Sequence, residues 1–329
     1  MEDFNLYDDK RVPIPVIPGF PPDYVSYALP GALQCHAYHG RLPMLFQAVR
    51  CGRYEIAISD YLINTGRKVM CKANVACLEL HFILKGKVLF NLKDLGWEEL
   101  DELHHNMIAL SDVKNEVYFK IIPVSTFDVH FLMEDFKLLA KKYPQLQPLL
   151  KALQTKGYAS LFALPEKTTP GMLHLIVKIK EAIKDGKTND ITTIEMIENL
   201  VVLVLENEPV KTKYKYNYTN IEKIHNAHYH IGQYVEEKDI LSGKMKKSGM
   251  KPDKFREGFR LLYGLLPSQY LLERRLQKAD WLIKEKRVCK LDDIAELCGF
   301  KSIEQLSKDY QHKFGTKISD VIAASKNSK

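Results

Sequence analysis

The N-terminal part of the chain alternates apolar and polar residues with the period of β-strands. Between Leu78 and Leu84 every second side chain is apolar, and the Lys85–Gly86 pair then predicts a two-residue hairpin turn into a strand that begins at Val88. Further alternating segments cover residues 106–111, 116–121 and 126–133. Several short strands with one apolar face predict an antiparallel barrel or sandwich over residues 1–133.

After Met133 the apolar residues recur with the period of α-helices. Segments 173–183 and 193–207 have this pattern, and Asp185–Gly186 predicts the end of the first of these helices. Thr192 and Glu195 have the spacing of a capping box for the second. Residues 134–210 are therefore predicted to form a helical hairpin. Its apolar surface either packs on the β-rich domain or forms a dimer interface.

The last third of the chain contains an internal repeat, which is the most informative pattern in the sequence. Residues 241–264 and 291–315 align with an offset of 50 that becomes 51, so that Gly249 corresponds to Gly299 and Gly264 to Gly315. Each copy predicts a short helix, a glycine-containing turn, a second helix and a glycine stop. Residues 225–325 are therefore predicted to be an all-α domain with two helix-turn-helix motifs, which follows a linker at residues 211–224.

The second helix of each motif is a candidate recognition helix. Phe255 and Phe259 in the first copy, and Leu306 and Tyr310 in the second, are expected to face inward. The residues left for solvent or DNA are Lys251, Asp253, Lys254, Arg256, Glu257, Lys301, Ser302, Ile303, Glu304, Gln305, Ser307 and Lys308. We expect the basic residues to contact phosphates or guanines, whereas the carboxylates either accept from cytosine or weaken binding.

The predicted connecting helix, residues 268–286, would hold the two recognition helices rigidly. Two such helices on one face can occupy successive major grooves, which are ~34 Å apart. The charge distribution agrees with a polyanionic partner. Residues 221–329 hold 22 Lys and Arg against 15 Asp and Glu, so the whole net charge of +7 lies in this third.

At this point the sequence resembles a known family. Residues 225–322 resemble the DNA-binding domain of AraC/XylS-type transcription regulators through the segment 291–300, the residues Leu306, Tyr310, Phe314 and Gly315, and the link at 264–275. Segments 79–86, 104–106 and 127–131 are similar to the cupin-like effector or oligomerisation domains of such regulators. The resemblance implies an activator with double-stranded DNA, a small-molecule effector, a homodimer and RNA polymerase as partners.

The first motif departs from this family pattern. Lys244 and Lys247 stand where the second motif has Ile294 and Leu297, and Gly243 lies inside the supporting helix at a cost of ~1 kcal/mol relative to Ala. The pattern therefore predicts that the first supporting helix is loose or displaced.

Four polar residues of the β-rich domain are candidates for binding a small molecule. Glu79 and His81 share one face of their strand, and Asp128 and His130 share one face of theirs, so both pairs can line a cavity. The H-x-H pattern with a downstream Glu expected of a cupin metal site is absent, as are a Ser/His/Asp elbow, a phosphate loop and H-E-x-x-H. We therefore predict no metal, no cofactor and no enzymatic activity.

The alternative interpretation is a small-molecule-binding or metal-dependent cupin protein whose C-terminal repeat is a structural or protein-interaction module. Both interpretations predict a cytoplasmic α+β protein that does not enter a membrane. The chain begins with an acidic, proline-containing segment rather than a secretory signal, and its six cysteines have no zinc-ligand spacing.

Overall fold

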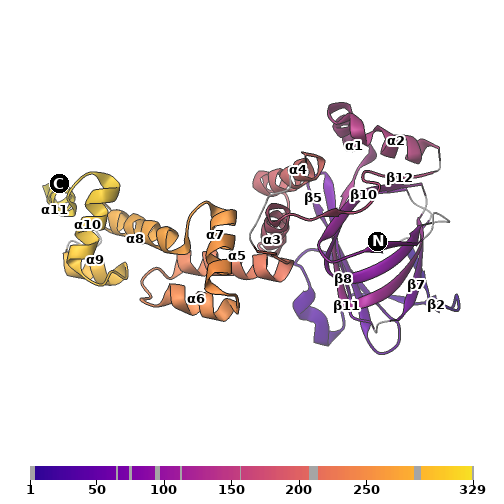
Figure 1. Cartoon of the computed structure of the whole chain (residues 1–329), viewed down its shortest axis with the longest axis horizontal. Helices are drawn as coiled ribbons and strands as arrows, with labels where there is room; N and C mark the ends of the chain where they lie inside the picture. The colour runs from indigo at the N-terminus through magenta and orange to yellow at the C-terminus, as the bar shows by residue number, and fades with distance from the viewer. Residues whose placement is uncertain are drawn as a thin grey trace. The chain divides into compact units, whose positions relative to one another are not determined.

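The computed structural model describes residues 4–63, 66–73, 76–92, 97–111, 113–155, 157–206, 214–284 and 290–327. The chain divides into two compact units, Met1–Lys213 and Tyr214–Lys329 (Figure 1). The first is an antiparallel β-barrel with helices, and the second is entirely helical. The predicted fold class is therefore confirmed.

The barrel is one antiparallel sheet whose described strands number thirteen. Its main path runs in the order β12-β10-β8-β11-β6-β5-β4-β3, while β1 pairs with β2 and β7, β7 with β11, β9 with β8, and β13 with β10. The strands are β1 (Phe4–Tyr7), β2 (Pro13–Ile14), β3 (Val16–Pro18), β4 (Leu33–Tyr38), β5 (Pro43–Cys51), β6 (Tyr54–Tyr61), β7 (Lys68–Ala73), β8 (Cys77–Leu92), β9 (Trp97–Leu100), β10 (His104–Leu110), β11 (Val113–Phe131), β12 (Tyr158–Ser160) and β13 (Glu166–Lys167). A short 3-10 helix, η1 (Pro22–Tyr27), lies between β3 and β4.

Two long strands, β8 and β11, run through the barrel, and this corrects the predicted hairpin at Lys85–Gly86. β8 continues through Gly86, whose φ is +83°, and the β8–β11 register shifts opposite it. A Cβ on Gly86 would lie 2.6 Å from the carbonyl oxygens of Ile121 and Pro123. The glycine thus allows close approach at a bulge instead of a chain reversal, because the segments on both sides of it pair with the same strand, β11.

The sheet closes because β11 has different partners along its length. β8 pairs with almost all of it, β7 with residues 113–118 and β6 with residues 124–131. The strands predicted at 116–121 and 126–133 are therefore two parts of one strand. Apolar side chains from both long strands, among them Ile83, Val88 and Phe119, form the buried core of the barrel.

The segment that follows the barrel contains more than the predicted hairpin. Its helices are α1 (Met133–Lys142), the 3-10 helix η2 (Pro144–Leu146), α2 (Gln147–Gln154), α3 (Pro170–Lys184) and α4 (Ile191–Glu206). Helices α3 and α4 pack together as expected, and α3 ends at Lys184 with Asp185 as its C-cap. However, β12 and β13 pair with β10, so residues 134–210 contribute strands to the barrel. Because α4 begins at Ile191, Thr192 lies inside it, and the capping box is at Thr169 of α3.

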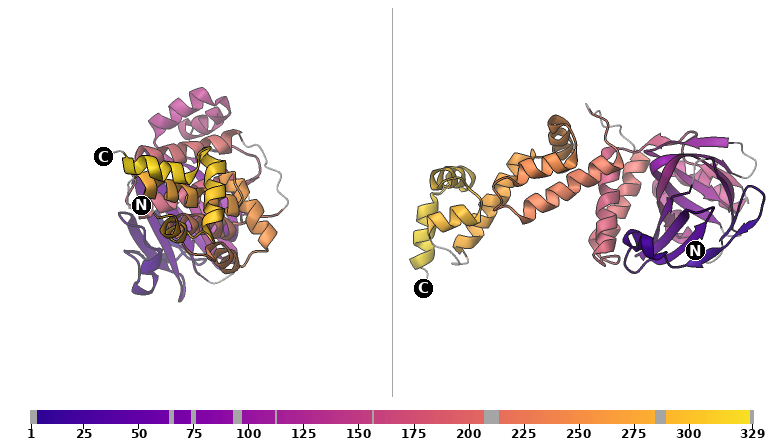
Figure 2. Two further views of the ribbon diagram at one scale, coloured as in Figure 1. Left: turned by 90° about the vertical axis from the view of Figure 1, so that its left-hand side faces the viewer. Right: turned by 90° about the horizontal axis from the view of Figure 1, so that it is seen from below.

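The helical unit contains both predicted helix-turn-helix motifs (Figures 1 and 2). Its helices are α5 (Tyr218–Gln233), α6 (Ile240–Ser248), α7 (Pro252–Tyr263), α8 (Pro267–Lys284), α9 (Leu291–Leu297), α10 (Ile303–Phe314) and α11 (Ile318–Asn327). The pairs α6–α7 and α9–α10 are the two motifs, and α8 packs against all four of these helices. None of the helices in the described ranges is long and apolar enough to cross a membrane.

The boundary between linker and helical unit differs from the prediction. Helix α5 begins at Tyr218, and the side chain of Asn217 caps it by accepting from the backbone N–H of Asn220 at 2.9 Å. Residues 218–224 are therefore helical. The alternating Lys/Tyr pattern ends at Asn217, which could not be recognised as a helix cap from the composition of the segment. Residues 211–213 of the predicted linker lie outside the described residues.

The first motif is held together by aromatic packing. The buried rings of Phe255 and Phe259 face inward as predicted, and the His228 ring stacks between Tyr263 and Tyr270 with centroid distances of 3.8 and 4.3 Å. Helix α6 is a continuous helix through Gly243, although its buried residues are only Ile240 and Ser248. Lys244 and Lys247 thus leave α6 with little buried apolar surface but do not interrupt the helix.

The second motif packs directly against the chain just before the first. Its turn residue Gly299 has a φ of +72°, and a Cβ there would lie 2.6 Å from the carbonyl oxygen of Val235 and 2.7 Å from that of Glu236. From α8, the Arg275 side chain donates to the carbonyl oxygens of Val235 and Glu237 at 2.8 and 3.1 Å. The Tyr310 hydroxyl donates to Asp280 at 2.7 Å and ties α10 to α8.

The two turn glycines provide a matched test of this packing. We expect Gly299→Ala to cost about 3 kcal/mol of unfolding free energy, because the Cβ adds a clash with backbone to an unfavourable φ. Gly249→Ala, at the equivalent turn with φ +66°, has no neighbour closer than 4.0 Å and should cost about 1 kcal/mol. Urea unfolding of a Trp97→Phe background, followed by Trp281 fluorescence, measures both. Equal losses would contradict the packing of Gly299.

Candidate DNA-binding surface and barrel cavity

The N-terminal end of α10 presents a polar surface. Ser302 caps the helix by accepting from the backbone N–H of Gln305 at 3.2 Å. A hydrogen bond from Ser302 lowers the pKa of the Glu304 carboxyl. The exposed residues are Lys301, Ser302, Glu304, Gln305 and Lys308, whereas Ile303 and Ser307 are half-buried. Leu306 and Tyr310 are buried as predicted, so this helix presents the residues that the sequence assigned to DNA.

The corresponding end of α7 is occupied by contacts within the protein. Lys251, Asp253 and Arg256 are exposed, and Arg256 pairs with Asp253 at 3.0 Å. Lys254 is half-buried with its Nζ 5.4 Å from the centre of the Tyr216 ring, and Glu257 is also half-buried. This surface therefore offers fewer unengaged basic groups than the surface of α10.

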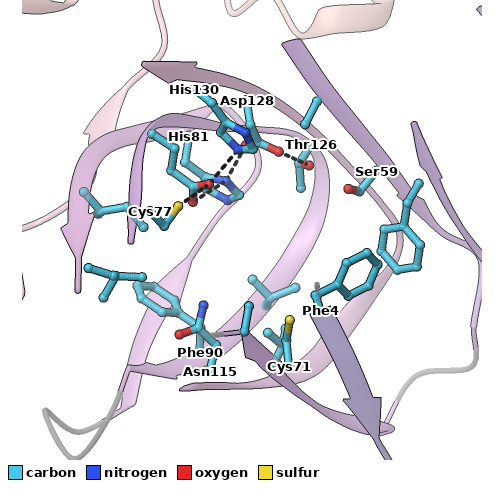
Figure 3. Close-up of a pocket in the computed structure, with 18 of the residues that line it drawn as sticks. Phe4, Ser59, Cys71, Cys77, His81, Phe90, Asn115, Thr126, Asp128 and His130 are labelled. Carbon is cyan, nitrogen blue, oxygen red and sulfur yellow. Dashed lines mark hydrogen bonds and ion pairs between the residues drawn. The ribbon is translucent and has the colours of Figure 1, made fainter. Parts of the chain in front are cut away.

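The barrel encloses a cavity of about 520 Å³. All four predicted ligand-binding residues, Glu79, His81, Asp128 and His130, line it as one cluster, and Figure 3 shows His81, Asp128 and His130 close to one another. They meet because β8 and β11 are neighbours, with His81 opposite Asp128 and Glu79 opposite His130. A cavity of this size is typical of small-molecule sites.

The cluster is a chain of ion pairs and hydrogen bonds. His81 Nδ1 lies 2.5 Å from Asp128 Oδ1, and the other oxygen of Asp128 accepts from the Thr126 hydroxyl at 2.9 Å. Both ring nitrogens of His130 are used, by Glu55 and by Glu79, each at 3.1 Å. The Cys77 thiol donates to Glu79 at 3.3 Å. These contacts hold the polar groups in fixed orientations toward the cavity.

The contacts determine the charge states of the cluster. Burial disfavours the charged form of His81, but Asp128 and Glu79 outweigh it and raise its pKa to about 9. Burial likewise opposes charging of His130, and Glu55 and Glu79 raise its pKa to about 10. Against the effect of burial, His130 and His81 lower the pKa of Glu79 to about 2. At pH 7 the cluster therefore combines two imidazolium cations with ionised carboxylates.

The rest of the cavity wall is mainly apolar. Phe4, Phe46, Phe90 and Phe119 line it, together with aliphatic residues of β7, β8 and β11. Cys71 also lines it, and burial raises the pKa of its thiol to about 12. The site can therefore receive a molecule with one polar end and an apolar body.

The sequence analysis missed several polar residues of the cavity, among them Cys77, Glu55 and Asn115. Cys77 continues the alternation of Glu79 and His81 and could have been found from it, since residues i, i+2 and i+4 share a face. Glu55 lies on β6, and Asn115 lies near the start of β11. Nothing in the local pattern of these two residues connects them with the cluster, because their positions follow from strand pairing distant in sequence.

Cys77, Glu79 and His130 are also the described residues best placed to share a metal ion. One ligand atom from each lies within 4.8 Å of the others. Thiolate, carboxylate and imidazole ligands together suit a transition metal such as zinc. The prediction that the chain uses no metal was made from the missing H-x-H pattern, and this cluster has a different spacing.

Comparison with known proteins identifies the class of the helical unit. Residues 245–324 match the model of a family described as a helix-turn-helix domain. The α6–α7 and α9–α10 motifs with their connecting helix thus form a helix-turn-helix domain, in agreement with the two motifs predicted from the internal repeat.

An individual protein that resembles the chain in sequence has a low identity to it. A protein described as the probable transcriptional regulator LumQ of Photobacterium leiognathi is 25% identical over 171 residues, which are 52% of this chain and 66% of that protein. The chain thus spans just under two thirds of this curated relative. The matched domain and this relative agree with the prediction that the chain is not an enzyme.

Three solved structures also show similarity. The DNA-binding domain of AdpA in complex with a target DNA is 22% identical and covers 31% of this chain and 91% of its own, with a TM-score of 0.30. Vibrio cholerae ToxT bound to (E)-4-(8-methylnaphthalen-1-yl)but-3-enoic acid is 12% identical, covering 83% and 99%, with a TM-score of 0.30. The AraC-like transcriptional activator CuxR is 12% identical, covering 81% and 94%, with a TM-score of 0.36.

The charge states of the cluster predict how barrel stability depends on pH. His81 and His130 have raised pKa values in the folded state, so their stabilisation is complete below pH 6.5 and is lost as the pH rises toward 9 and 10. Glu79 has a lowered pKa, so its contribution is present above pH 4.5 and is lost toward pH 2. We expect the unfolding free energy to fall by about 2–3 kcal/mol for each of the two histidines between pH 6.5 and 9.

Urea unfolding at a series of pH values measures this dependence. His81→Gln should flatten the alkaline fall relative to the unsubstituted protein, because it removes one of the titrating groups. His312→Gln, which changes an exposed histidine of α10, is the control and should leave the fall intact. An unchanged slope in His81→Gln would contradict the assigned charge state.

Proposed function

We propose that the chain is a sequence-specific DNA-binding transcription regulator whose barrel cavity binds a small-molecule effector. The observation that carries the proposal is the exposed polar N-terminal end of α10 in an AraC-type helix-turn-helix domain. The N-terminal end of a recognition helix enters the major groove, and its positive dipole favours contact with phosphates. A homodimer, RNA polymerase as partner, activation and a cytoplasmic location stay predictions of the sequence.

In this proposal the residues of α10 divide into two groups. Gln305 and Ser307 read bases, and Glu304 accepts from cytosine N4, because these short or planar polar groups form directional hydrogen bonds. Lys301 and Lys308 contact phosphates, which fixes position and affinity without sequence information. Both lysines are exposed, Lys301 just before the first residue of α10 and Lys308 within the helix, which agrees with this division.

The first motif takes a secondary part in the proposal. Arg256 must leave Asp253 before it contacts DNA, and Lys254 must leave the Tyr216 ring. Lys251 is exposed and needs no rearrangement. We therefore assign most of the sequence discrimination to α10. To α7 we assign phosphate contacts, together with weaker base contacts of Asp253 and Glu257.

The second candidate function is a metal-dependent cupin-like protein, favoured by the cluster of Cys77, Glu79 and His130. Its C-terminal domain would then serve as a structural or interaction module. Metal analysis of the purified full chain decides between the two. A stoichiometric metal that is lost in the His81→Gln/His130→Gln double variant would favour the metal-dependent protein, whereas metal-free protein that binds DNA supports the regulator.

Salt dependence tests whether the basic surface of the helical unit contacts phosphates. The logarithm of the affinity for the protein's own promoter should fall linearly with the logarithm of the salt concentration, with a slope of about −0.9 per phosphate contact. Lys308→Ala should weaken all sites alike and reduce the slope by about 1. Fluorescence anisotropy at a series of salt concentrations measures both, and a flat response would contradict the proposal.

Base readout by α10 is tested separately. Gln305→Ala should change the ranking of promoter sites by about 1–3 kcal/mol at one base pair, because a directional hydrogen bond to a base edge is lost. Gln311→Ala is the matched control, since it removes an exposed glutamine of the same helix at its other end. Binding to a library of randomised sites measures the preference. The same preference for both variants would exclude Gln305 from base recognition.

A further inference from the structure

The side chains that line the barrel cavity indicate the chemical class of its ligand. This inference rests on the proposed function, in which the cavity binds an effector. We propose that the effector is an apolar, aromatic molecule with one protonated amine. In this arrangement the amine lies at Asp128 and Glu79, and the aromatic body lies against the phenylalanine wall. Charge, unused hydrogen-bonding capacity and the composition of the wall all lead to this class.

The charge of the cavity favours a cation over an anion. Three carboxylates, of Glu55, Glu79 and Asp128, line it and outnumber the two imidazole rings of His81 and His130, whatever the protonation of the rings. No lysine or arginine stands among the lining residues of the described structure. Both ring nitrogens of His130 are already paired with carboxylates, so a ligand carboxylate could not bind them without breaking an ion pair. An added negative charge would therefore be repelled and poorly solvated.

Hydrogen-bonding capacity gives a second, independent indication. Asp128 is more than nine-tenths buried, and its Oδ1, although close to His81, accepts no hydrogen bond of acceptable geometry. The side-chain oxygen of Asn115, toward the apolar part of the cavity, is likewise buried without a partner. Asn115 Oδ1 has no partner, and Asp128 Oδ1 contacts only the His81 ring among the described residues; both atoms are acceptors, so the complementary ligand supplies donors. Figure 3 shows Asp128 in the polar cluster and Asn115 beside Phe90 and Cys71.

The wall determines the body of the ligand. Phe4, Phe46, Phe90 and Phe119 line the cavity, and Phe4 packs edge-to-face on Phe46 with centroids 5.4 Å apart. Such rings bind a flat aromatic group through burial and edge-to-face contacts, and their faces also attract a cation. A purely polar ligand such as a sugar would leave this surface without a partner.

The ligand class is tested with three probes of similar size and different head groups. Isothermal titration calorimetry of the full chain at pH 7 compares 2-phenylethylamine, 2-phenylethanol and 3-phenylpropanoate. We expect the amine to bind at least tenfold more tightly than the carboxylate, with the alcohol between them. A carboxylate that binds as tightly as the amine, or three affinities within twofold of one another, would overturn the inference without reference to any variant.

Variants then locate the amine. Asp128→Asn removes a charge at almost constant shape and should weaken the amine at least tenfold while leaving the alcohol within threefold. Glu116→Gln is the matched control, because Glu116 lies on the same strand, pairs with Lys68 at 2.6 Å and does not line the cavity. If Asp128→Asn does not fold, as judged by circular dichroism, Glu79→Gln takes its place. An amine affinity unchanged in the folded variant would overturn the placement.

The remaining measurements separate this inference from its competitors. Stoichiometric binding of Zn²⁺ that is lost in Cys77→Ser and that blocks the amine would overturn it in favour of a metal site. DNA binding by the same preparation distinguishes a wrong ligand class from a wrong proposed function. Failure of the amine with intact DNA binding contradicts the ligand class alone, whereas loss of DNA binding with intact amine binding contradicts the proposed function.

Discussion

The arrangement of the two helix-turn-helix motifs depends on one close contact between backbones. Gly299, in the turn of the second motif, packs against the carbonyl groups that precede the first, and Arg275 of α8 donates to the same segment. A side chain at the turn would push the two apart, and without the guanidinium these carbonyls would lose their donors. The two motifs and the helix α8 that connects them are thus held as one body. Under the proposed function, the protein itself would then set the spacing between its two DNA contacts.

The barrel holds charged side chains in fixed positions around a cavity that stays open. It does so with two long strands that place carboxylates opposite histidines, so that each charge has a partner before any ligand arrives. Buried ion pairs contribute little net stability compared with apolar packing, but breaking one is costly. The cluster therefore fixes the orientation of its polar groups, and under the proposed function these groups form a preorganised binding site.

The sequence predicted elements that depend on local pattern and missed those that depend on distant pairing. The internal repeat fixed the turns at Gly249 and Gly299 and the inward Phe259 and Tyr310, because helical periodicity and glycine stops are local signals. The hairpin at Lys85–Gly86 was wrong, since a glycine with positive φ serves a bulge as well as a turn. Glu79 and His130 were found by strand alternation, whereas Glu55 and Asn115 enter the site only through strand pairing.

The two cavity cysteines determine how the site behaves toward oxidants. Burial raises the pKa of the Cys71 thiol to about 12, and burial together with the Glu79 carboxylate raises that of Cys77 well above its usual range. Since the thiolate is the nucleophile that attacks peroxides and disulfides, the raised pKa values keep both residues mainly in the less reactive thiol form at neutral pH. The raised pKa values thus make the two cavity thiols less sensitive to the redox state of their surroundings. Under the proposed function, the domain would then respond to the concentration of its ligand rather than to oxidants.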